Sequence, residues 1–185
     1  VTVKGLFSIG LHPCFPAHAG LEKVKQWSTH PAVIAIGECG LDKICTTDFL
    51  LQQKIFEQQV QLAKSLQKPL IIHCVKAWDE LLKILQACKV PVVFHGFNKS
   101  KELALQLTAK GYYISFGKAL EQDRIKQILP MLPAQHILLE TDMAEMPIST
   151  IYEWAAAAMA IDLNSLSLQI EKNAVAVFGN KIIET

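Results

Sequence analysis

Short apolar runs alternate with segments of helical periodicity along almost the whole chain. Six of these runs are rich in β-branched or aromatic residues and are bounded by glycine, proline or polar residues, as expected of strands. Because they are largely apolar, we expect strands buried on both faces, as in parallel sheets that helices cover. The runs are GLFSIGLHP (5–13), AVIAIGECG (32–40), PLIIHCV (69–75), PVVFHGF (91–97), GYYISFG (111–117) and HILLETD (136–142).

The segments between these runs repeat apolar residues at intervals of three and four, which predicts amphipathic helices. Two more helices are expected over TIYEWAAAAMA (150–160) and NSLSLQIEKNAVAVFG (164–179), with Asn164 as the N-cap of the second. Strand and helix in alternation predict a parallel α/β sheet. Four predicted helices end before a residue that stops a helix, namely Pro69, Pro91, Gly111 and Pro133.

The number of predicted strands fits two architectures. A complete (β/α)₈ barrel typically takes about 250 residues and at least about 200, whereas this chain has 185. Six strands therefore suit either an open sheet or a barrel that lacks two of its eight strands. No linker or low-complexity tract interrupts the pattern, so we expect a single domain over residues 1–185.

Composition and charge argue against a protein that binds long duplexes or spans a membrane. The net charge is +1 and Arg124 is the single arginine, so there is no broad basic surface for long duplex nucleic acid. No apolar run is long enough to span a membrane, and we expect no signal peptide. Five cysteines without a C-x-x-C pair are typical of reduced thiols, so we expect a cytoplasmic protein.

A polar residue that can bind metal stands at or near the end of five of the six apolar runs. Because the carboxyl ends of parallel strands meet on one rim, we expect these side chains to share a site there. Each alone has an ordinary explanation, such as a structural histidine, a solvated carboxylate or a helix N-cap. Together they are costly to bury unless something binds them, which favours a metal site. The residues are His12, Glu38, His73, His95 and Asp142.

Imidazole and carboxylate ligands without a thiolate suit Zn²⁺, Mn²⁺ or a similar divalent ion that keeps positions open for water. We expect the second strand to end at Gly37 and Glu38, so that the carboxylate reaches the metal. Cys39 and Cys74 each follow a predicted ligand, and strand alternation turns them to the opposite side, where we expect small buried hydrophobes. Lys76, in the loop after the third strand, is either a solvated helix start or a contact to phosphate.

Several longer motifs resemble the TatD family of metal-dependent deoxyribonucleases, within the amidohydrolase superfamily of metal-bearing TIM barrels. The motifs are GLHP, IGECGLD, QQKIFEQQVQLAKSLQKPLIIHC, VVFHGF, YYISFG and ILLETD, in this order. The resemblance runs from about Gly5 to Phe178, nearly the whole chain. It implies an α/β fold of the TIM-barrel metallo-hydrolase type, incomplete here because about six of eight parallel strands are present.

The resemblance also implies a role for each candidate residue. Glu38 would bridge two divalent metal ions, and Asp142 would bind the first ion and take the proton of the attacking water. These two are therefore the expected catalytic residues, and one or two ions of Zn, Mn or Mg are the implied cofactor. The implied metal ligands are Glu38, His73, His95 and Asp142, and the implied substrate contacts are His12 and Lys76.

The chain departs from the family pattern at its start. The family begins with a strand that carries a His-x-His pair, followed by a second strand, and neither precedes GLHP in this sequence. The first metal site would then keep only Glu38 and Asp142, whereas the second would keep Glu38, His73 and His95. An active enzyme of this type needs the two strands upstream of this sequence or from a partner chain.

Three functions follow as hypotheses. The first is a deoxyribonuclease of the TatD type, which cleaves phosphodiester bonds of DNA by metal-activated water. The second is an amidohydrolase-superfamily enzyme that acts on a small ester, amide or phosphoester. The third is an inactive, metal-poor barrel that serves as a binding protein. Its open edge at the first strand would invite pairing with another chain, so a homo-oligomer that covers this edge is expected.

Overall fold

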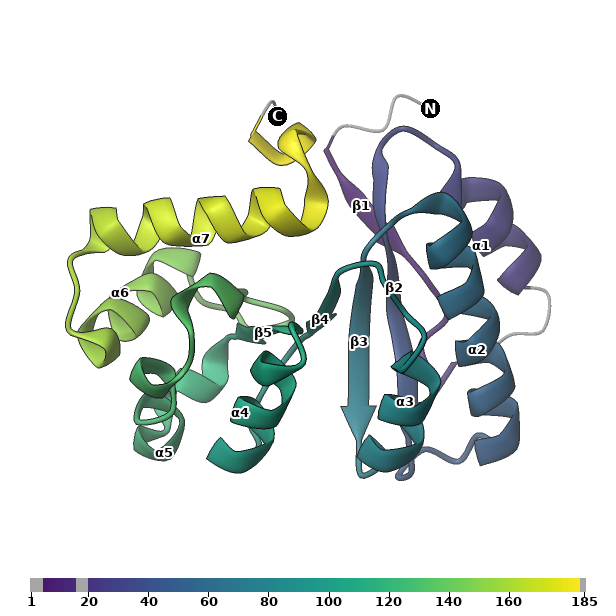
Figure 1. Ribbon diagram of the computed structural model, residues 1–185, viewed down its shortest axis with the longest axis horizontal. Coiled ribbons are helices and arrows are strands. Elements are labelled where there is room, and N and C mark those ends of the chain that lie inside the picture. The colour runs from purple at the N-terminus through teal and green to yellow at the C-terminus, as the bar shows by residue number, and fades with distance from the viewer. Residues whose placement is uncertain (1–4, 16–19, 184–185) are drawn as a thin grey trace. The chain divides into compact units, whose positions relative to one another are not determined.

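The computed structural model describes residues 5–15 and 20–183 (Figure 1). The chain divides into two compact units. The first comprises the residues up to Val92 together with those from Lys181 onward, and the second spans Val93–Asn180. The single domain over residues 1–185 stays a prediction. Within the described ranges, no helix combines the length and the apolar character that crossing a membrane requires.

The first unit holds three parallel strands, which pair in chain order. Helix α2 begins after the N-cap Asp48, whose side chain accepts a hydrogen bond from the backbone N–H of Leu51 at 2.9 Å. Its buried face packs against β2, and α1 packs against β1 and β2. The elements are β1 (Phe7–Ile9), α1 (Gly20–Ser28), β2 (Val33–Asp42), α2 (Phe49–Leu66), β3 (Leu70–Val75) and α3 (Trp78–Leu85).

Strand β2 does not end at Gly37 and Glu38, so that prediction is wrong. It continues to Asp42, and Gly40 lies opposite His73 of β3. The glycines permit a close approach of the two backbones instead of ending the strand. A Cβ atom at Gly37 would lie 2.5 Å from the carbonyl oxygen of Ile71, and one at Gly40 would overlap the carbonyl oxygen of His73. Glu38 therefore projects from within a strand.

The second unit repeats the pattern with three parallel strands that also pair in chain order. Its core includes Val93, Leu138 and Val177. Asn173 of α7 donates hydrogen bonds to the carbonyl of Ala134, in the 3₁₀ turn before β6, and to that of Ile137, the first residue of β6, both at 2.7 Å. These bonds fix the helix to the strand. The elements are β4 (Val92–Phe94), α4 (Lys101–Ala109), β5 (Tyr113–Phe116), α5 (Asp123–Lys126), β6 (Ile137–Leu139), α6 (Ile148–Met159) and α7 (Leu163–Phe178).

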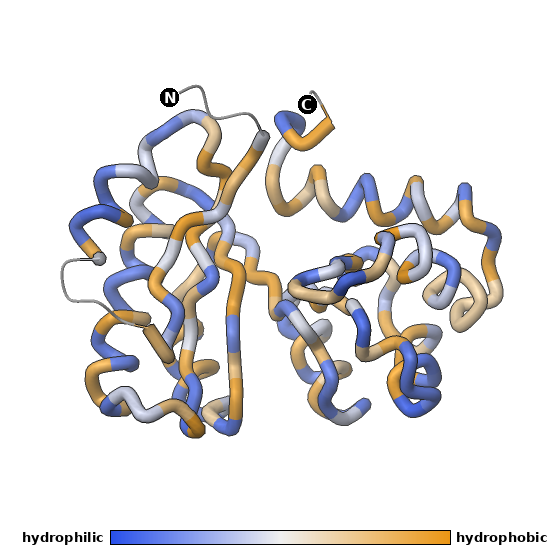
Figure 2. The backbone as a smooth tube through the Cα atoms, turned by 180° about the vertical axis from the view of Figure 1, so that it is seen from behind, coloured by the Kyte–Doolittle hydropathy of each residue, from blue (hydrophilic) through white to orange (hydrophobic). Residues whose placement is uncertain are grey.

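The predicted helices form, with two corrections. The helix predicted to end before Pro133 is not continuous, because Pro130 lacks an N–H and interrupts the segment, which splits into α5 and a 3₁₀ turn. Asn164 is not the N-cap of α7. Asp162 takes that position, and its carboxylate accepts from the Ser165 N–H at 3.0 Å and the Ser165 hydroxyl at 2.6 Å. Figure 2 shows the alternation of hydrophobic and hydrophilic positions along α7.

Candidate metal centre

In the first unit, His73 of β3 is held by Asp42 at the end of β2. Nε2 of His73 lies 2.9 Å from Oδ2 of Asp42. Burial raises the pKa of the Asp42 carboxyl. The hydrogen bond and charge of His73, with the Ile44 N–H at 2.7 Å, outweigh burial and hold the pKa below its usual value. An ionised Asp42 accepts the proton of Nε2, so Nδ1 is the ring nitrogen that can ligate a metal.

His12 and Glu38 lie on the same side of this unit as His73. Nε2 of His12 is 3.8 Å from Oε2 of Glu38, and the rings of His12 and His73 are 4.4 Å apart between centroids. A ligand atom of Glu38 also lies within 4.8 Å of one of His73. The backbone N–H of Cys14 donates to Nδ1 of His12 at 3.2 Å, so His12 presents its Nε2–H toward Glu38.

Two buried glutamines of α2, two turns apart on the same face, fix the main chain around this cluster. Gln52 is 2% exposed; its Oε1 accepts from the Asp42 N–H at 2.8 Å, and its Nε2 donates to the Asp42 carbonyl at 2.9 Å and the Thr47 carbonyl at 3.0 Å. Gln59 is 0% exposed; its Oε1 accepts from the Leu11 N–H at 2.7 Å and its Nε2 donates to the Leu11 carbonyl at 3.1 Å. Hydrogen bonds from α2 therefore fix the main chain at Leu11, next to His12, and at Asp42, which contacts His73.

In the second unit, His95 directly follows β4 and Glu140 directly follows β6. Nδ1 of His95 lies 3.7 Å from Oε1 of Glu140, and that oxygen accepts from the Gly96 N–H at 2.6 Å. Asp142 is exposed in the turn after β6 and has a left-handed backbone, with φ of 47°. Glu140 and Asp142 both line a hollow of about 570 Å³, which Lys118 also lines.

The structure thus groups His12, Glu38 and His73 in one unit, and it places His95 and Asp142 in the other. Lys76 is exposed just after β3, with φ of 54°, and its contact to phosphate stays a prediction. Asp42, Gln52 and Glu140 were missed as site residues. A carboxylate directly after an apolar run was the available signal for Glu140, and glutamines on the apolar face of a helix were the signal for Gln52.

The cysteines correct one further expectation. Cys14 and Cys45 form a disulfide across 31 residues, so the expectation of five reduced thiols is wrong for this pair. The two residues lie in loops after neighbouring strands, and the fold brings them together. Cys39 and Cys74 are buried and lie outside the disulfide, as small buried residues should, and burial raises the pKa of the Cys39 thiol.

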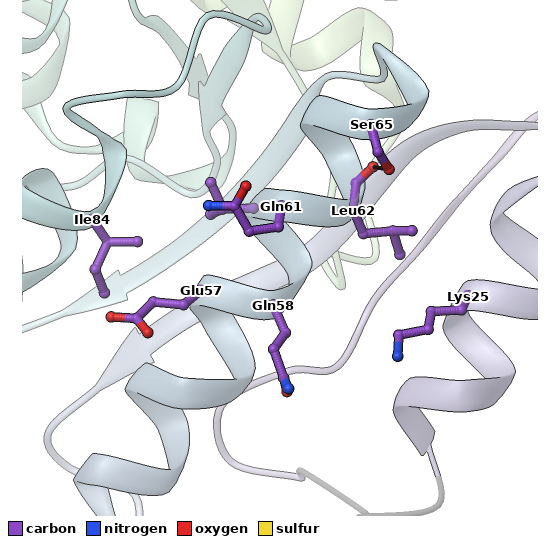
Figure 3. Close-up of a pocket in the computed structure, with 8 residues that line it drawn as sticks. Lys25, Glu57, Gln58, Gln61, Leu62, Ser65 and Ile84 are labelled. Atoms are coloured by element: carbon purple, nitrogen blue, oxygen red, sulfur yellow. Dashed lines mark hydrogen bonds between the residues drawn. The ribbon is translucent and has the colours of Figure 1, made fainter.

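The first unit also contains a hollow, about 690 Å³ in volume, which lies between helices and away from the candidate metal ligands (Figure 3). Lys25 of α1, Glu57 and Gln61 of α2 and Ile84 of α3 line it. Within the described residues, none of the predicted metal ligands lines this hollow. The candidate centre therefore lies on the strands and the loops that follow them.

Comparison with known sequences gives a consistent family. The family model described as TatD related DNase matches residues 3–179. The 3'-5' ssDNA/RNA exonuclease TatD of Escherichia coli (strain K12) is 32% identical over 146 residues, which cover 72% of this chain and 55% of the relative. The 3'-5' RNA nuclease TATDN2 of Homo sapiens is 33% identical over 154 residues, 73% of this chain and 19% of the relative. The chain thus spans about half or less of the length of these relatives.

Comparison with solved structures agrees. The crystal structure of YjjV, a TatD homologue from Escherichia coli K12, matches with a TM-score of 0.84 at 25% identity, covering 94% of this chain and 76% of that one. The sequence of YjjV, named as a metal-dependent hydrolase, is 33% identical over 153 residues, 77% of this chain and 59% of the relative. The predicted α/β fold of TIM-barrel type, with six parallel strands, is confirmed. The chain belongs to the family of TatD-related DNases.

Proposed function

We propose that this chain carries the activity of a metal-dependent hydrolase of the TatD type, which cleaves phosphodiester bonds of single-stranded nucleic acid. The observation that supports it most directly is the linked group of Asp42, His73, His12 and Glu38 in the first unit. The substrate follows from the relatives, which are named as exonucleases of single-stranded DNA and RNA and as an RNA nuclease. DNA remains the expected substrate, with RNA as a second.

We propose one or two divalent ions of Zn, Mn or Mg as cofactor, with Glu38, His73, His95 and Asp142 as the ligands. The donors fit such an ion, because they are imidazole nitrogens and carboxylate oxygens and because Asp42 engages the ring nitrogen of His73 opposite to the ligating one. When bound, the metal lowers the pKa of water from 15.7 to about 7 and neutralises charge on the phosphoryl oxygens.

The remaining steps belong to the side chains. Asp42 holds His73 in the tautomer and orientation that ligation requires. His12 carries its proton on Nε2 and donates it as a hydrogen bond to a phosphate oxygen, because Nδ1 accepts from the Cys14 N–H. Asp142 is exposed and takes the proton of the attacking water as general base. Lys76, also exposed, contacts the next phosphate of the strand.

Single strands suit the charge of this chain better than long duplexes. Binding of a duplex draws on many lysines and arginines that neutralise phosphates. The net charge here is +1, with 18 basic against 17 acidic residues. A few local contacts from His12 and Lys76 position one or two phosphates, which is sufficient for removing nucleotides from a strand end.

We also propose that residues 1–185 form one domain and that a second copy covers the edge of β1, where Phe7 and Trp27 are 43% and 50% exposed.

The test combines metal content with cleavage. The chain is loaded with Mn²⁺ or Zn²⁺, ions per chain are counted by elemental analysis, and end-labelled single-stranded DNA, RNA and duplex DNA of one sequence are digested. We expect bound metal and a ladder of shortened single strands, both lost in Glu38→Gln and kept in Glu57→Gln, which changes an exposed carboxylate of α2. Bound metal with no cleavage of any nucleic acid, but turnover of a small ester or phosphoester, would replace the proposal with the second hypothesis. No stoichiometric metal would reject it.

A further inference from the structure

Two cysteines and a carboxylate meet in the first unit beside the proposed ligands. Cys14 lies in the loop after β1 and Cys45 in the loop after β2, and their Cα atoms are 5.2 Å apart. Sγ of Cys14 lies 3.7 Å from Oδ2 of Asp42. One ligand atom from each of the three residues lies within 4.8 Å of the other two. We propose that Cys14, Cys45 and Asp42 form a second divalent-metal site in the reduced protein, selective for a thiolate-binding ion such as Zn²⁺.

The spacing of the ligand atoms fits a tetrahedral ion. With Zn–S of about 2.3 Å and Zn–O of about 2.1 Å, a sulfur and an oxygen on one ion lie about 3.6 Å apart. The sulfur of Cys14 and Oδ2 of Asp42 are 3.7 Å apart, which matches this value. The two sulfurs would need to separate to about 3.7 Å for the same ion, and rotation of two side chains achieves this once their bond is reduced. Water completes the tetrahedron.

The carboxylate is already fixed where the ion needs it. Asp42 is 7% exposed, and its Oδ1 accepts from the Ile44 N–H at 2.7 Å. Gln52 holds the N–H and the carbonyl of the same residue. Oδ2 faces the sulfur of Cys14 and also accepts from Nε2 of His73 at 2.9 Å, so the ion would use a further lone pair of this oxygen. Both cysteines are half-buried, so an ion or a reductant reaches them from solvent.

The site differs chemically from the proposed catalytic one. It contains two thiolates, whereas Glu38, His73, His95 and Asp142 contain none, so only this site gives a thiolate charge-transfer band with Co²⁺. It also exists in only one redox state. A phosphine and one water reduce the disulfide to two thiols and leave as the phosphine oxide, and metal binding then displaces the two thiol protons into solvent. A low-molecular-weight disulfide restores the bond by exchange and leaves as two thiols.

The test uses Co²⁺ as a probe of thiolate ligation. The chain is reduced with a phosphine, freed of it, and titrated with Co²⁺ while the thiolate-to-cobalt charge-transfer absorption is recorded. We expect a band that saturates at one equivalent in the reduced chain and no band in the oxidised chain. Cys14→Ser and Cys45→Ser should lose it, and Asp42→Asn should weaken binding about 10-fold or more. Cys88→Ser, a half-buried thiol elsewhere in the unit, and Glu38→Gln should keep the band.

A measurement on the unaltered chain guards against variants that fail to fold. Reduced chain with and without one equivalent of Zn²⁺ is treated with iodoacetamide, and alkylation of each cysteine is quantified by peptide mass spectrometry. We expect Zn²⁺ to slow alkylation of Cys14 and Cys45 at least 10-fold and to leave Cys88 unchanged. Equal alkylation of the pair with and without Zn²⁺, or a cobalt band that survives both serine variants, overturns the proposal. Loss of the band in Glu38→Gln with retention in Cys14→Ser would assign the thiolate signal elsewhere and also overturn it.

Discussion

Replacement of Gln52 by leucine isolates the link between α2 and the end of β2. Leucine is close to glutamine in size and suits a helix, so the change removes hydrogen bonds without opening a cavity. The lost partners are the N–H and carbonyl of Asp42, both buried, and the carbonyl of Thr47. The variant thus tests whether these bonds stabilise the first unit, separately from any effect of packing.

The expected cost follows from the groups left without a partner. A buried donor or acceptor left unsatisfied costs about 1–3 kcal/mol, so the two main-chain groups of Asp42 together cost about 2–6 kcal/mol. The apolar surface that leucine adds returns on the order of 1–2 kcal/mol. The difference spans about 0–5 kcal/mol, and we expect Gln52→Leu to lower the free energy of unfolding by about 2–3 kcal/mol, the middle of this range. That is a large part of the roughly 5–15 kcal/mol of a typical domain.

The assay is urea unfolding followed by far-UV circular dichroism, with the free energy extrapolated linearly to water. The matched control is Gln58→Leu, an exposed glutamine of the same helix, which we expect to change stability by less than about 0.5 kcal/mol. If Gln52→Leu cost no more than Gln58→Leu, the buried hydrogen bonds would contribute nothing net, and the reasoning would be refuted.

Three further predictions concern single residues. Asp42→Asn should weaken binding of the metal for which His73 is a proposed ligand about 10- to 100-fold, measured by competition with a chelator, because asparagine no longer fixes the ring tautomer; an unchanged affinity contradicts this. Burial lowers the pKa of His136, so the unfolded chain binds its proton more readily, and stability should be complete above pH 6.5 and fall as pH drops through the folded pKa. His136→Gln should lose less stability than the unaltered chain between pH 7.5 and 5, measured by urea unfolding. Asp162→Ala should cost about 1 kcal/mol as a lost N-cap, whereas Asn164→Ala should cost less than about 0.5 kcal/mol in the same measurement.

Local sequence patterns predict a strand well where the residue that bounds it lies in the same stretch of sequence. The run 69–75 begins at a proline and contains β3, since Pro69 stops α2 and the β-branched residues that follow favour a strand. The same logic fails at β2, because Gly37 and Gly40 resemble a strand end. Glycine is needed at these two positions because carbonyl oxygens of β3 approach them closely. Nothing in residues 32–40 reveals that β3 lies there.

The candidate site shows the same division. The residues His12, Glu38 and His73 are visible in sequence because each follows or interrupts an apolar run. Asp42 becomes a site residue only through register, since β2 must extend four residues past the predicted end at Glu38 for its carboxylate to reach His73. The disulfide partner of Cys14 likewise depends on which loops are neighbours, and sequence spacing alone does not pair it with Cys45.

The position of His12 and His73 in the first unit depends on a helix as much as on the sheet. Gln52 and Gln59 lie seven residues apart, which places them two turns apart on one face of α2. One holds the main chain next to the carboxylate that orients His73, and the other holds the residue before His12. Burial of a polar side chain on a helix face costs free energy unless its hydrogen bonds are satisfied. Here the partners are main-chain groups at the end of β2 and in the loops after β1 and β2. The helix therefore preorganises His12 and His73, since the main chain beside them is fixed by buried hydrogen bonds.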